Sequence, residues 1–283
     1  MKSVVLAAGY ATRLYPLTEN FPKPLLEVAG KSILDWLLDD IDNIEGIDEH
    51  IIISNHRYVE HFENWKKNSK LKNPVTIIDD GSMSNETRLG AVKDIQFAID
   101  TLKLDDDLFI VAGDNMLDFS FQSFVDLFHE KNAAVVMCNY EEDVNTLRRC
   151  GVMVPDSDFR VVSMEEKPQD PKSNWCVGPF YIYKKDELHL IKQGIEDGCG
   201  TDAPGSFVCY LCEKTDVYAL EIPGNRYDIG TLESYEEVKI CSIFMNAFSL
   251  MVCLSAVPAT AAVTSTKPTC WLPAVRTCIF CKS

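Results

Sequence analysis

The chain has 283 residues, of which 46% are hydrophobic, enough to build one large globular domain. Its formal net charge of -16 repels nucleic acid and anionic lipid, so neither is expected as a general partner. A phosphate-bearing ligand would need local cations or a metal ion to overcome that field.

The N-terminal apolar run at residues 4–7 is too short for a signal peptide and ends before Gly9, so it predicts a buried first strand. We therefore expect a cytoplasmic protein. In that reducing compartment most of the eleven cysteines are expected to be buried thiols without a disulfide framework. Cys209 and Cys212 lack a second pair at zinc-finger spacing, which indicates structural thiols.

Strand and helix patterns then alternate along the first half of the chain. Helical spacing follows the cap Ser32 and recurs over 58–65, 92–102 and 124–128, between apolar strands at 51–53, 75–78, 108–112 and 133–137. This succession predicts an α/β fold of three layers, with helices on both faces of a mostly parallel twisted sheet. Ligands bind such sheets at the carboxyl ends of strands, which points to the loops after residues 7, 78 and 112.

The second half of the chain, from about residue 151, is predicted to consist mainly of β-strands. A hairpin is predicted from 151–154 and 160–164, followed by strands at 175–183 and 217–221. We expect this part to lie over the first half as a substrate lid.

The composition changes abruptly near Ile240, which predicts a catalytic domain at 1–240 and a separate tail at 241–283. The tail has five cysteines and no Asp, Glu or Gly, as a shifted reading frame would produce. Residues 240–263 are uncharged and long enough for a bilayer at ~20 residues, but polar residues and Pro258 interrupt them. A dispensable, poorly ordered tail ranks first, a membrane anchor second and an oligomer contact third.

The strongest motif is a small-residue loop after the first strand, followed by a lysine between prolines: Leu6-Ala7-Ala8-Gly9-Tyr10-Ala11-Thr12-Arg13-Leu14-Tyr15-Pro16-Leu17-Thr18, then Pro22-Lys23-Pro24-Leu25. Small residues such as Ala8 and Gly9 let backbone N–H groups approach phosphate oxygens. Arg13 can grip a phosphate with its planar fork, and Lys23 adds a second cation. The spacing fits neither a Walker A loop nor a dinucleotide fingerprint.

Two carboxylates stand beside glycines at the ends of predicted elements. Asp114 follows Gly113 after an apolar strand, and Asp228 precedes Gly230. Two separated carboxylates together with phosphate oxygens suit octahedral Mg²⁺. A further run, Glu165-Glu166-Lys167-Pro168, could bind a sugar phosphate through Lys167 and sugar hydroxyls through Glu166; the alternative is a solvated charge cluster.

Together these segments resemble the sugar-phosphate nucleotidyltransferases, which include glucose-1-phosphate thymidylyltransferase and related uridylyl- and guanylyltransferases. The resemblance covers about residues 1–240 and departs at Ala11, where many members have glycine, so the loop is stiffer if that position needs a positive φ. It implies a Rossmann-like nucleotidyltransferase fold with a β-rich sugar-binding part. It also implies transfer of a nucleotidyl group from a nucleoside triphosphate to a sugar 1-phosphate with release of pyrophosphate, with glucose 1-phosphate and dTTP or UTP favoured.

The resemblance also implies roles for individual residues. Asp114 and Asp228 would hold the catalytic Mg²⁺, and Arg13, Lys23 and Asp114 would be catalytic. The substrate-binding positions would be Ala8, Gly9, Gly90, Gly151, Glu166, Lys167 and Gly178.

Two other readings remain open. A regulatory paralogue would bind nucleotide or sugar without turnover, but it should have lost a metal carboxylate or the loop arginine, which this chain retains. A phosphocholine cytidylyltransferase would use another acceptor, and the Glu-Lys-Pro run and Gly151 favour a sugar. The expected partners are the two substrates, with a homo-oligomer also compatible with the sequence.

Overall fold

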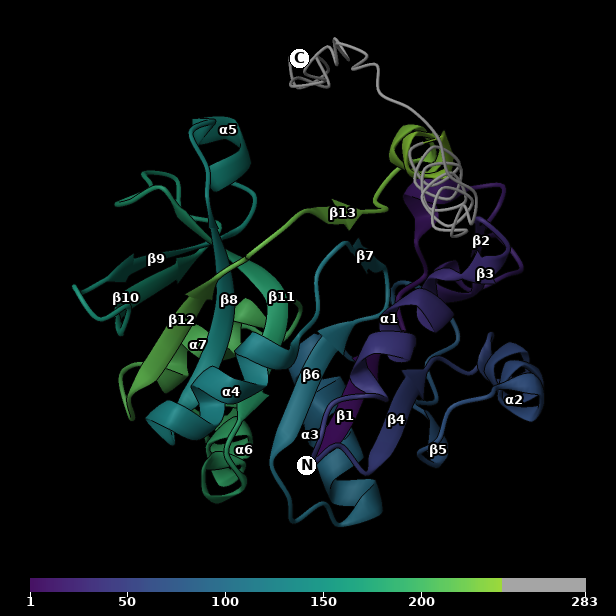
Figure 1. Cartoon of the computed structure of the whole chain (residues 1–283), viewed down its shortest axis with the longest axis horizontal. Coiled ribbons are helices and arrows are strands. Elements are labelled where there is room, and N and C mark those ends of the chain that lie inside the picture. Colours follow the sequence, from purple (N-terminus) through teal and green to yellow (C-terminus); the bar gives the residue numbers. More distant parts are fainter. Residues whose placement is uncertain (241–283) are drawn as a thin grey trace, which may run out of the picture. The chain divides into compact units, whose positions relative to one another are not determined.

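The structure is a computed structural model that describes residues 1–240; the tail at 241–283, with its anchor and oligomer hypotheses, lies outside the described residues. Within residues 1–240, nine strands form one sheet, along which β10, β9, β11, β6, β1, β4 and β5 are neighbours while β8 and β12 join through β11 (Figure 1). The strands of this sheet are β1 (Lys2–Leu6), β4 (Glu49–Ser54), β5 (Val75–Asp79), β6 (Leu108–Ala112), β8 (Ala134–Tyr140), β9 (Gly151–Pro155), β10 (Val161–Glu166), β11 (Trp175–Tyr183) and β12 (Val217–Glu221).

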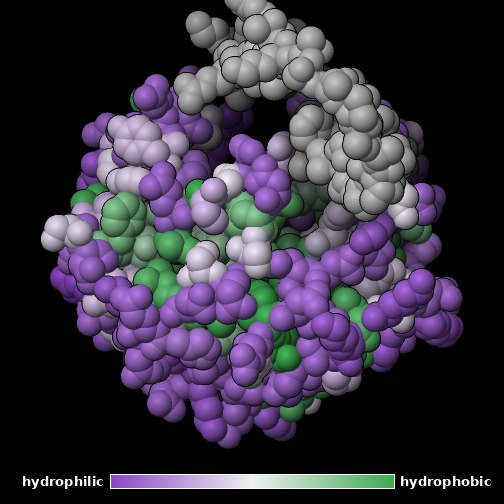
Figure 2. Space-filling model, in the orientation of Figure 1, coloured by the Kyte–Doolittle hydropathy of each residue, from purple (hydrophilic) through white to green (hydrophobic). Residues whose placement is uncertain are grey.

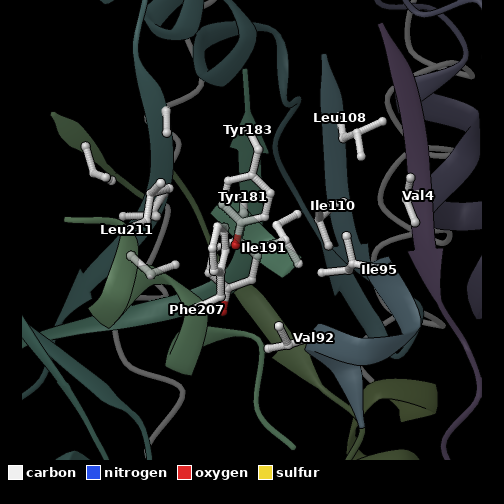
Figure 3. Packing of buried hydrophobic residues seen from close by; sticks show 14 of the residues in the cluster. Val4, Val92, Ile95, Leu108, Ile110, Tyr181, Tyr183, Ile191, Phe207 and Leu211 are labelled. Atoms are coloured by element: carbon white, nitrogen blue, oxygen red, sulfur yellow. The ribbon is translucent and has the colours of Figure 1, made fainter. Parts of the chain in front are cut away.

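Helices cover both faces of the sheet, so the predicted three-layer α/β fold is confirmed. Val4 and Val5 of β1 point to opposite faces and belong to two separate buried clusters. The first cluster packs against α3 (Ala91–Leu102), α6 (His189–Glu196) and α7 (Gly205–Leu211), and the second against α1 (Ile33–Ile41), α2 (Val59–Asn68) and α4 (Gln122–Lys131). Figure 3 shows the first cluster, in which Phe207 packs edge-on against Tyr183 beside Ile191.

The predicted cap of α1 is present. The Ser32 hydroxyl accepts the Asp35 backbone N–H, and the Asp35 carboxylate accepts the Ser32 N–H in return. Each partner satisfies a donor that the start of a helix leaves unpaired.

The β-rich second half differs from the expected lid, because its strands extend the same sheet. β1 pairs in parallel with β4 and β6, whereas β11 pairs antiparallel with β6, β8 and β9. One edge of β11 has two partners in succession: Val177 pairs with Gly151 of β9, and Phe180 pairs with Val111 of β6. Along this edge the sheet is split where β6 ends and β9 begins, and the register of β11 with β8 on its other edge shifts between Val177 and Tyr181. The long, buried β11 makes the two halves one layer.

Two short hairpin-like sheets complete the fold beside this split. β2 (Glu27–Val28) pairs with β3 (Lys31–Ser32), and β7 (Asn115–Leu117) pairs antiparallel with β13 (Arg226–Asp228). A third apolar cluster lies beneath them and includes Leu14, Ile229 and Tyr235. The Tyr235 hydroxyl donates to the Glu27 carbonyl at 2.7 Å. This cluster ties the N-terminal loop to the end of the described chain, including the helix at 232–240.

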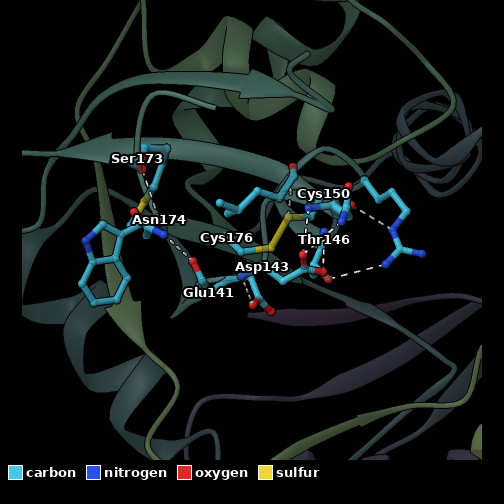
Figure 4. Close-up of a disulfide and its surroundings, with 12 residues drawn as sticks. Glu141, Asp143, Thr146, Cys150, Ser173, Asn174 and Cys176 are labelled. Carbon is cyan, nitrogen blue, oxygen red and sulfur yellow. Dashed lines mark hydrogen bonds between the residues drawn. A yellow bond between two sulfur atoms is a disulfide. The ribbon is translucent and has the colours of Figure 1, made fainter. Parts of the chain in front are cut away.

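The cysteines follow the expectation only in part. Cys138, Cys199, Cys209 and Cys212 are free, and burial raises the pKa of Cys138 and of Cys209 to about 12, so both remain protonated structural thiols. Cys150 and Cys176, in contrast, form a disulfide (Figure 4). The pairing of β9 with β11 brings their Cα atoms to 6.2 Å, within the range that a disulfide spans. The spacing of the two residues in the sequence carries no such signal.

The molecular face in Figure 2 is hydrophilic over most of its rim, with apolar side chains near its middle. Among residues 1–240, no helix is both long and apolar enough to cross a membrane.

Candidate active site

A cavity of about 420 Å³ opens at the split in the sheet; we call it the main cavity. It lies at the carboxyl ends of β1 and β6, where parallel α/β sheets bind ligands. Seven of the predicted site residues line it: Ala8, Gly9, Gly90, Asp114, Gly151, Glu166 and Asp228.

A smaller cavity of about 170 Å³ adjoins the main cavity; we call it the loop cavity. Arg13 and Lys23 line it, together with Gly9 and Asp114, which also line the main cavity. The two predicted cations therefore lie at one end of a continuous site, and Asp114 stands where the two cavities meet.

Buried side chains hold the loop after β1. The Asn55 amide donates to the Ala8 carbonyl at 3.0 Å, and the Thr18 hydroxyl donates to the Ala11 carbonyl at 2.8 Å. Ala11 has φ 45° and ψ 44°, so the position that departs from the family signature does require the left-handed region. The Arg13 side chain is exposed, and within residues 1–240 it has no hydrogen-bond or ion-pair partner. Its fork is thus available to an anionic ligand.

Lys23 and Asp114 form an ion pair between a buried ammonium group and a half-buried carboxylate at the centre of the site. The Lys23 ammonium donates to Asp114 Oδ2 at 2.7 Å, and only 7% of Lys23 is exposed. The Asn115 amide donates to Asp114 Oδ1 at 2.6 Å. Both carboxylate oxygens are therefore oriented, and the lysine is held in place at the centre of the site.

Asp228 reaches Asp114 through the pairing of β13 with β7, in which Asp228 lies opposite Asn115. The Ile229 N–H also donates to the Asp114 carbonyl at 3.3 Å. The surrounding protein desolvates the Asp228 carboxyl and raises its pKa, and the charge of Asp114 adds to this effect, while Lys23 and two arginines oppose it. The two predicted metal carboxylates thus share one electrostatic environment.

Glu166 of β10 also lines the main cavity. A Cβ atom at Gly151 or at Gly205 would crowd the Glu166 carboxylate, so these glycines make room for it. Burial raises the pKa of Glu166. A carboxyl group that is half-buried and faces a polar cleft can accept hydrogen bonds from ligand hydroxyl groups.

Gly90 begins α3 with φ 92°, a value that favours glycine, and its backbone lies against the carbonyl of Thr201. Asp94, in the first turn of α3, is 7% exposed and lines the main cavity. Burial and then the neighbouring Asp80 raise the pKa of Asp94 to about 7. A neutral carboxylic acid at this wall is therefore compatible with neutral pH.

Two predicted residues do not line the cavities. Lys167 is exposed with φ 51°, and its backbone N–H donates to the Cys150 carbonyl at 3.0 Å. Gly178 is buried at the register shift of β11, and its neighbours Val177 and Pro179 line the main cavity in its place.

The main cavity is also lined by residues to which the sequence assigned no role, although Arg88 and Asn115 lie within quoted motifs: Arg88, Asp94, Asn115, Tyr181, Asp202 and Arg226. For one of these residues, the sequence contained a pattern that could have predicted its place in the site. Arg226 lies two residues before Asp228, and residues at that spacing share one face of a strand. Asp202, in contrast, follows no pattern that the sequence displays.

Comparisons with known proteins agree with this geometry. The family model described as nucleotidyl transferase matches residues 2–241. A protein of Sulfolobus acidocaldarius, described as a candidate mannose-1-phosphate guanyltransferase, is 30% identical over 85% of this chain and 62% of its own length. A Haloferax volcanii protein named UTP–glucose-1-phosphate uridylyltransferase AglF is 26% identical over 84% of this chain and 95% of its own. The chain spans about half to three fifths of the length of three curated relatives.

A solved UDP-glucose pyrophosphorylase in complex with UDP-glucose superposes with a TM-score of 0.74, covering 86% of this chain and 98% of that one. At 19% identity this likeness concerns the fold, and it confirms the predicted nucleotidyltransferase architecture. Since the matching model covers nearly all of residues 1–240, the chain belongs to the nucleotidyl transferase family.

Proposed function

We propose that this protein transfers a nucleotidyl group from a nucleoside triphosphate to a sugar 1-phosphate, releasing pyrophosphate and forming a nucleoside diphosphate sugar. One observation carries the proposal. A continuous site joins two cations, Arg13 and Lys23, to a central pair of carboxylates and then to Glu166. This order matches the order of groups in the reaction: leaving pyrophosphate, reacting phosphates and sugar.

The loop cavity suits the leaving pyrophosphate. Arg13 would grip it with its free guanidinium, and backbone N–H groups near Gly9 would approach it closely because Gly9 has no side chain. Lys23, held by Asp114, would lie beside the α-phosphate. The attacking phosphate oxygen is already an anion, so no general base is needed, and holding the two substrates in line can supply roughly 7–11 kcal/mol of the barrier reduction.

The residues present fit Mg²⁺. The central donors are the carboxylates of Asp114 and Asp228, and hard oxygen ligands of this kind suit that ion. Within residues 1–240 there is no cluster of three or more acidic, histidine or cysteine side chains arranged to hold a metal, so phosphate oxygens would complete the coordination. When bound, Mg²⁺ would neutralise charge that develops on the phosphates.

The proposal also includes the identity of the acceptor sugar phosphate and of the nucleobase in the triphosphate. We favour glucose 1-phosphate with UTP or dTTP, supported by the loop signature and by the printed name of the Haloferax relative. The Sulfolobus name includes another sugar and another base, so the discrimination depends on a few contacts near Gly90 and Glu166. A cytoplasmic location and a homo-oligomer stay predictions.

The geometry of the site disfavours both alternative functions. The regulatory paralogue is disfavoured because Arg13, Lys23 and both carboxylates line one site. The phosphocholine cytidylyltransferase is disfavoured because a buried carboxyl, Glu166, suits sugar hydroxyl groups.

A panel of nucleoside triphosphates and sugar 1-phosphates, with phosphocholine as a further acceptor, tests the proposal. We expect pyrophosphate release that depends on both substrates and on Mg²⁺. If phosphocholine were the only acceptor that supported pyrophosphate release, the proposed function would be wrong and the protein would be a phosphocholine cytidylyltransferase. Binding of substrates without release from any pair would favour the regulatory paralogue.

A further inference from the structure

The main cavity is rich in acids, which makes the binding of a second phosphate difficult. Five carboxyl groups line it within the described chain: Asp94, Asp114, Glu166, Asp202 and Asp228. A sugar 1-phosphate carries its negative charge into this cavity, so a nearby cation is required.

Among residues 1–240, only two cationic side chains line the main cavity, Arg88 and Arg226. Arg88 is already engaged, because its Nε and Nη2 both donate to Asp202 Oδ1, at 3.1 and 2.8 Å. Arg226 has no carboxylate within ion-pairing distance in the described part of the chain. Unlike Arg88, it therefore has no direct ion-pair partner in the described part of the chain.

A neutral group holds Arg226 in place. Its Nη1 donates to Asn115 Oδ1 at 2.9 Å, and Asn115, which is 1% exposed, donates in turn to Asp114 at 2.6 Å. The carboxylate of Asp114 then accepts from Lys23. This chain of hydrogen bonds fixes Arg226 relative to the central carboxylates and leaves its other N–H groups for a ligand.

Arg226 lines the main cavity together with Glu166 and Asp228. It shares a strand face with Asp228, because the two residues lie two positions apart in β13. Lys167, in contrast, is exposed and does not line the cavity.

We propose that Arg226, positioned by Asn115, binds the phosphate group of the acceptor sugar 1-phosphate. This inference rests on the proposed function and assigns to Arg226 the contact that the family resemblance gives to Lys167. A guanidinium fork can hold two phosphate oxygens at once and so aim the third at the α-phosphorus.

The test compares Arg226→Gln and Arg226→Lys with Lys167→Gln, and uses Arg160→Gln as a matched control. Arg160 is an exposed arginine that pairs with Asp156 and Asp216 outside the cavities. For each variant, the KM for sugar phosphate and for triphosphate is measured with the best substrate pair. Equilibrium titrations with the same sugar 1-phosphate and with the unphosphorylated sugar give a readout that needs no turnover.

We expect Arg226→Gln to weaken sugar 1-phosphate binding and to raise its KM by about 10- to 100-fold, the scale of a hydrogen bond to a charged group. The triphosphate KM should change less than about threefold, Arg226→Lys should recover part of the loss, and the unphosphorylated sugar should bind all variants alike. Melting temperatures should match the wild type.

Three results would overturn the inference: an unchanged affinity in Arg226→Gln, a loss confined to Lys167→Gln, or a wild-type chain that binds no sugar 1-phosphate of the panel. Failure of the proposed function looks different. The wild type would then release no pyrophosphate from any pair, while the titrations would still decide whether Arg226 binds the sugar phosphate.

Discussion

At the scale of single residues, Ala11 shows how one side chain affects the nucleotide loop. Its backbone lies in the left-handed region, which costs an L-residue roughly 1–2 kcal/mol, whereas glycine enters it freely. Thr18 donates to the Ala11 carbonyl and helps to hold that conformation. Alanine at this position therefore restricts the loop more than glycine would.

Ala11→Gly should raise the free energy of unfolding by about 0.5–1 kcal/mol, because the relief of strain exceeds the added entropy of the unfolded chain. Urea unfolding measures this change. Ala29→Gly is the matched control, since Ala29 also has a positive φ, 51°, but does not line the cavities. Destabilisation by Ala11→Gly with stabilisation by Ala29→Gly would show that the loop does not carry this strain.

The paired carboxylates give a second prediction at this scale. Asp114→Asn and Asp228→Asn should each reduce turnover by at least about 100-fold, the usual loss for one electrostatic stabiliser in a reacting site. The melting temperature should be unchanged in Asp228→Asn and lower in Asp114→Asn, because that change leaves the buried Lys23 ammonium without its ion-pair partner. EDTA should stop the wild-type reaction. Asp170→Asn, an exposed change, is the control. Near-normal turnover of both site variants with Mg²⁺ present would contradict the metal assignment.

At the scale of secondary-structure elements, a buried acid pair, Asp80 and Asp94, lies between the end of β5 and the first turn of α3 and opposes folding when both groups are ionised. Asp80 accepts the Ser82 N–H and hydroxyl, whereas Oδ1 of Asp94 is buried without a hydrogen-bond partner in the described chain. Two acids in contact share a proton more readily than they both ionise.

This pair predicts a pH dependence of stability. The pKa of Asp94 is raised from 3.8 to about 7 in the folded state, so between these values the native chain holds a proton that the unfolded chain has lost. The free energy of unfolding should therefore fall as pH rises, by at most about 1.4 kcal/mol per pH unit, and level off above about pH 7. Asp94→Asn should remove this slope and be more stable than wild type at pH 8 by roughly 2–4 kcal/mol.

Urea unfolding at pH 5 and pH 8 checks this prediction. Asp100→Asn on the same helix α3 is exposed and should leave the slope unchanged. An Asp94→Asn protein that keeps the wild-type slope would contradict it.

At the scale of the whole molecule, the described chain contains all the parts of the site. Its three apolar clusters connect the sheet, the helices on both faces and the segment at 232–240. The family model ends at residue 241. We therefore expect a chain that ends after Ile240 to keep its catalytic constants within about twofold and to remain in solution.

Size-exclusion chromatography and steady-state kinetics on that shortened chain measure the effect. A chain that ends after Gly230 is the contrasting control, because it lacks Tyr235 and Val238 of the third apolar cluster. This chain should be less stable, since each lost core side chain costs about 2–5 kcal/mol of the free energy of unfolding. Aggregation or lost turnover of the chain ending at Ile240 would show that the tail is structural.

The sequence by itself determined the layered fold and predicted which residues lie at the centre of the candidate site. Strand and helix periodicities are local, so the elements could be placed within a few residues, and the helix cap at Ser32 was predicted by its own neighbours. Arg13, Lys23, Asp114 and Asp228 were found because each stands in a short motif at the end of an element. Such motifs need no knowledge of distant contacts.

Only the tertiary structure decided the rest, because it depends on which distant strands pair. The register of β11 with β6 and β9 opens the main cavity and joins Cys150 to Cys176. The pairing of β13 with β7 brings Arg226 to Asn115, and the backbone around Lys167 leaves that side chain exposed. Side chains that are neighbours only through strand pairing leave no signature in the order of residues, so the roles of Arg226 and Lys167 could be compared only in the folded chain.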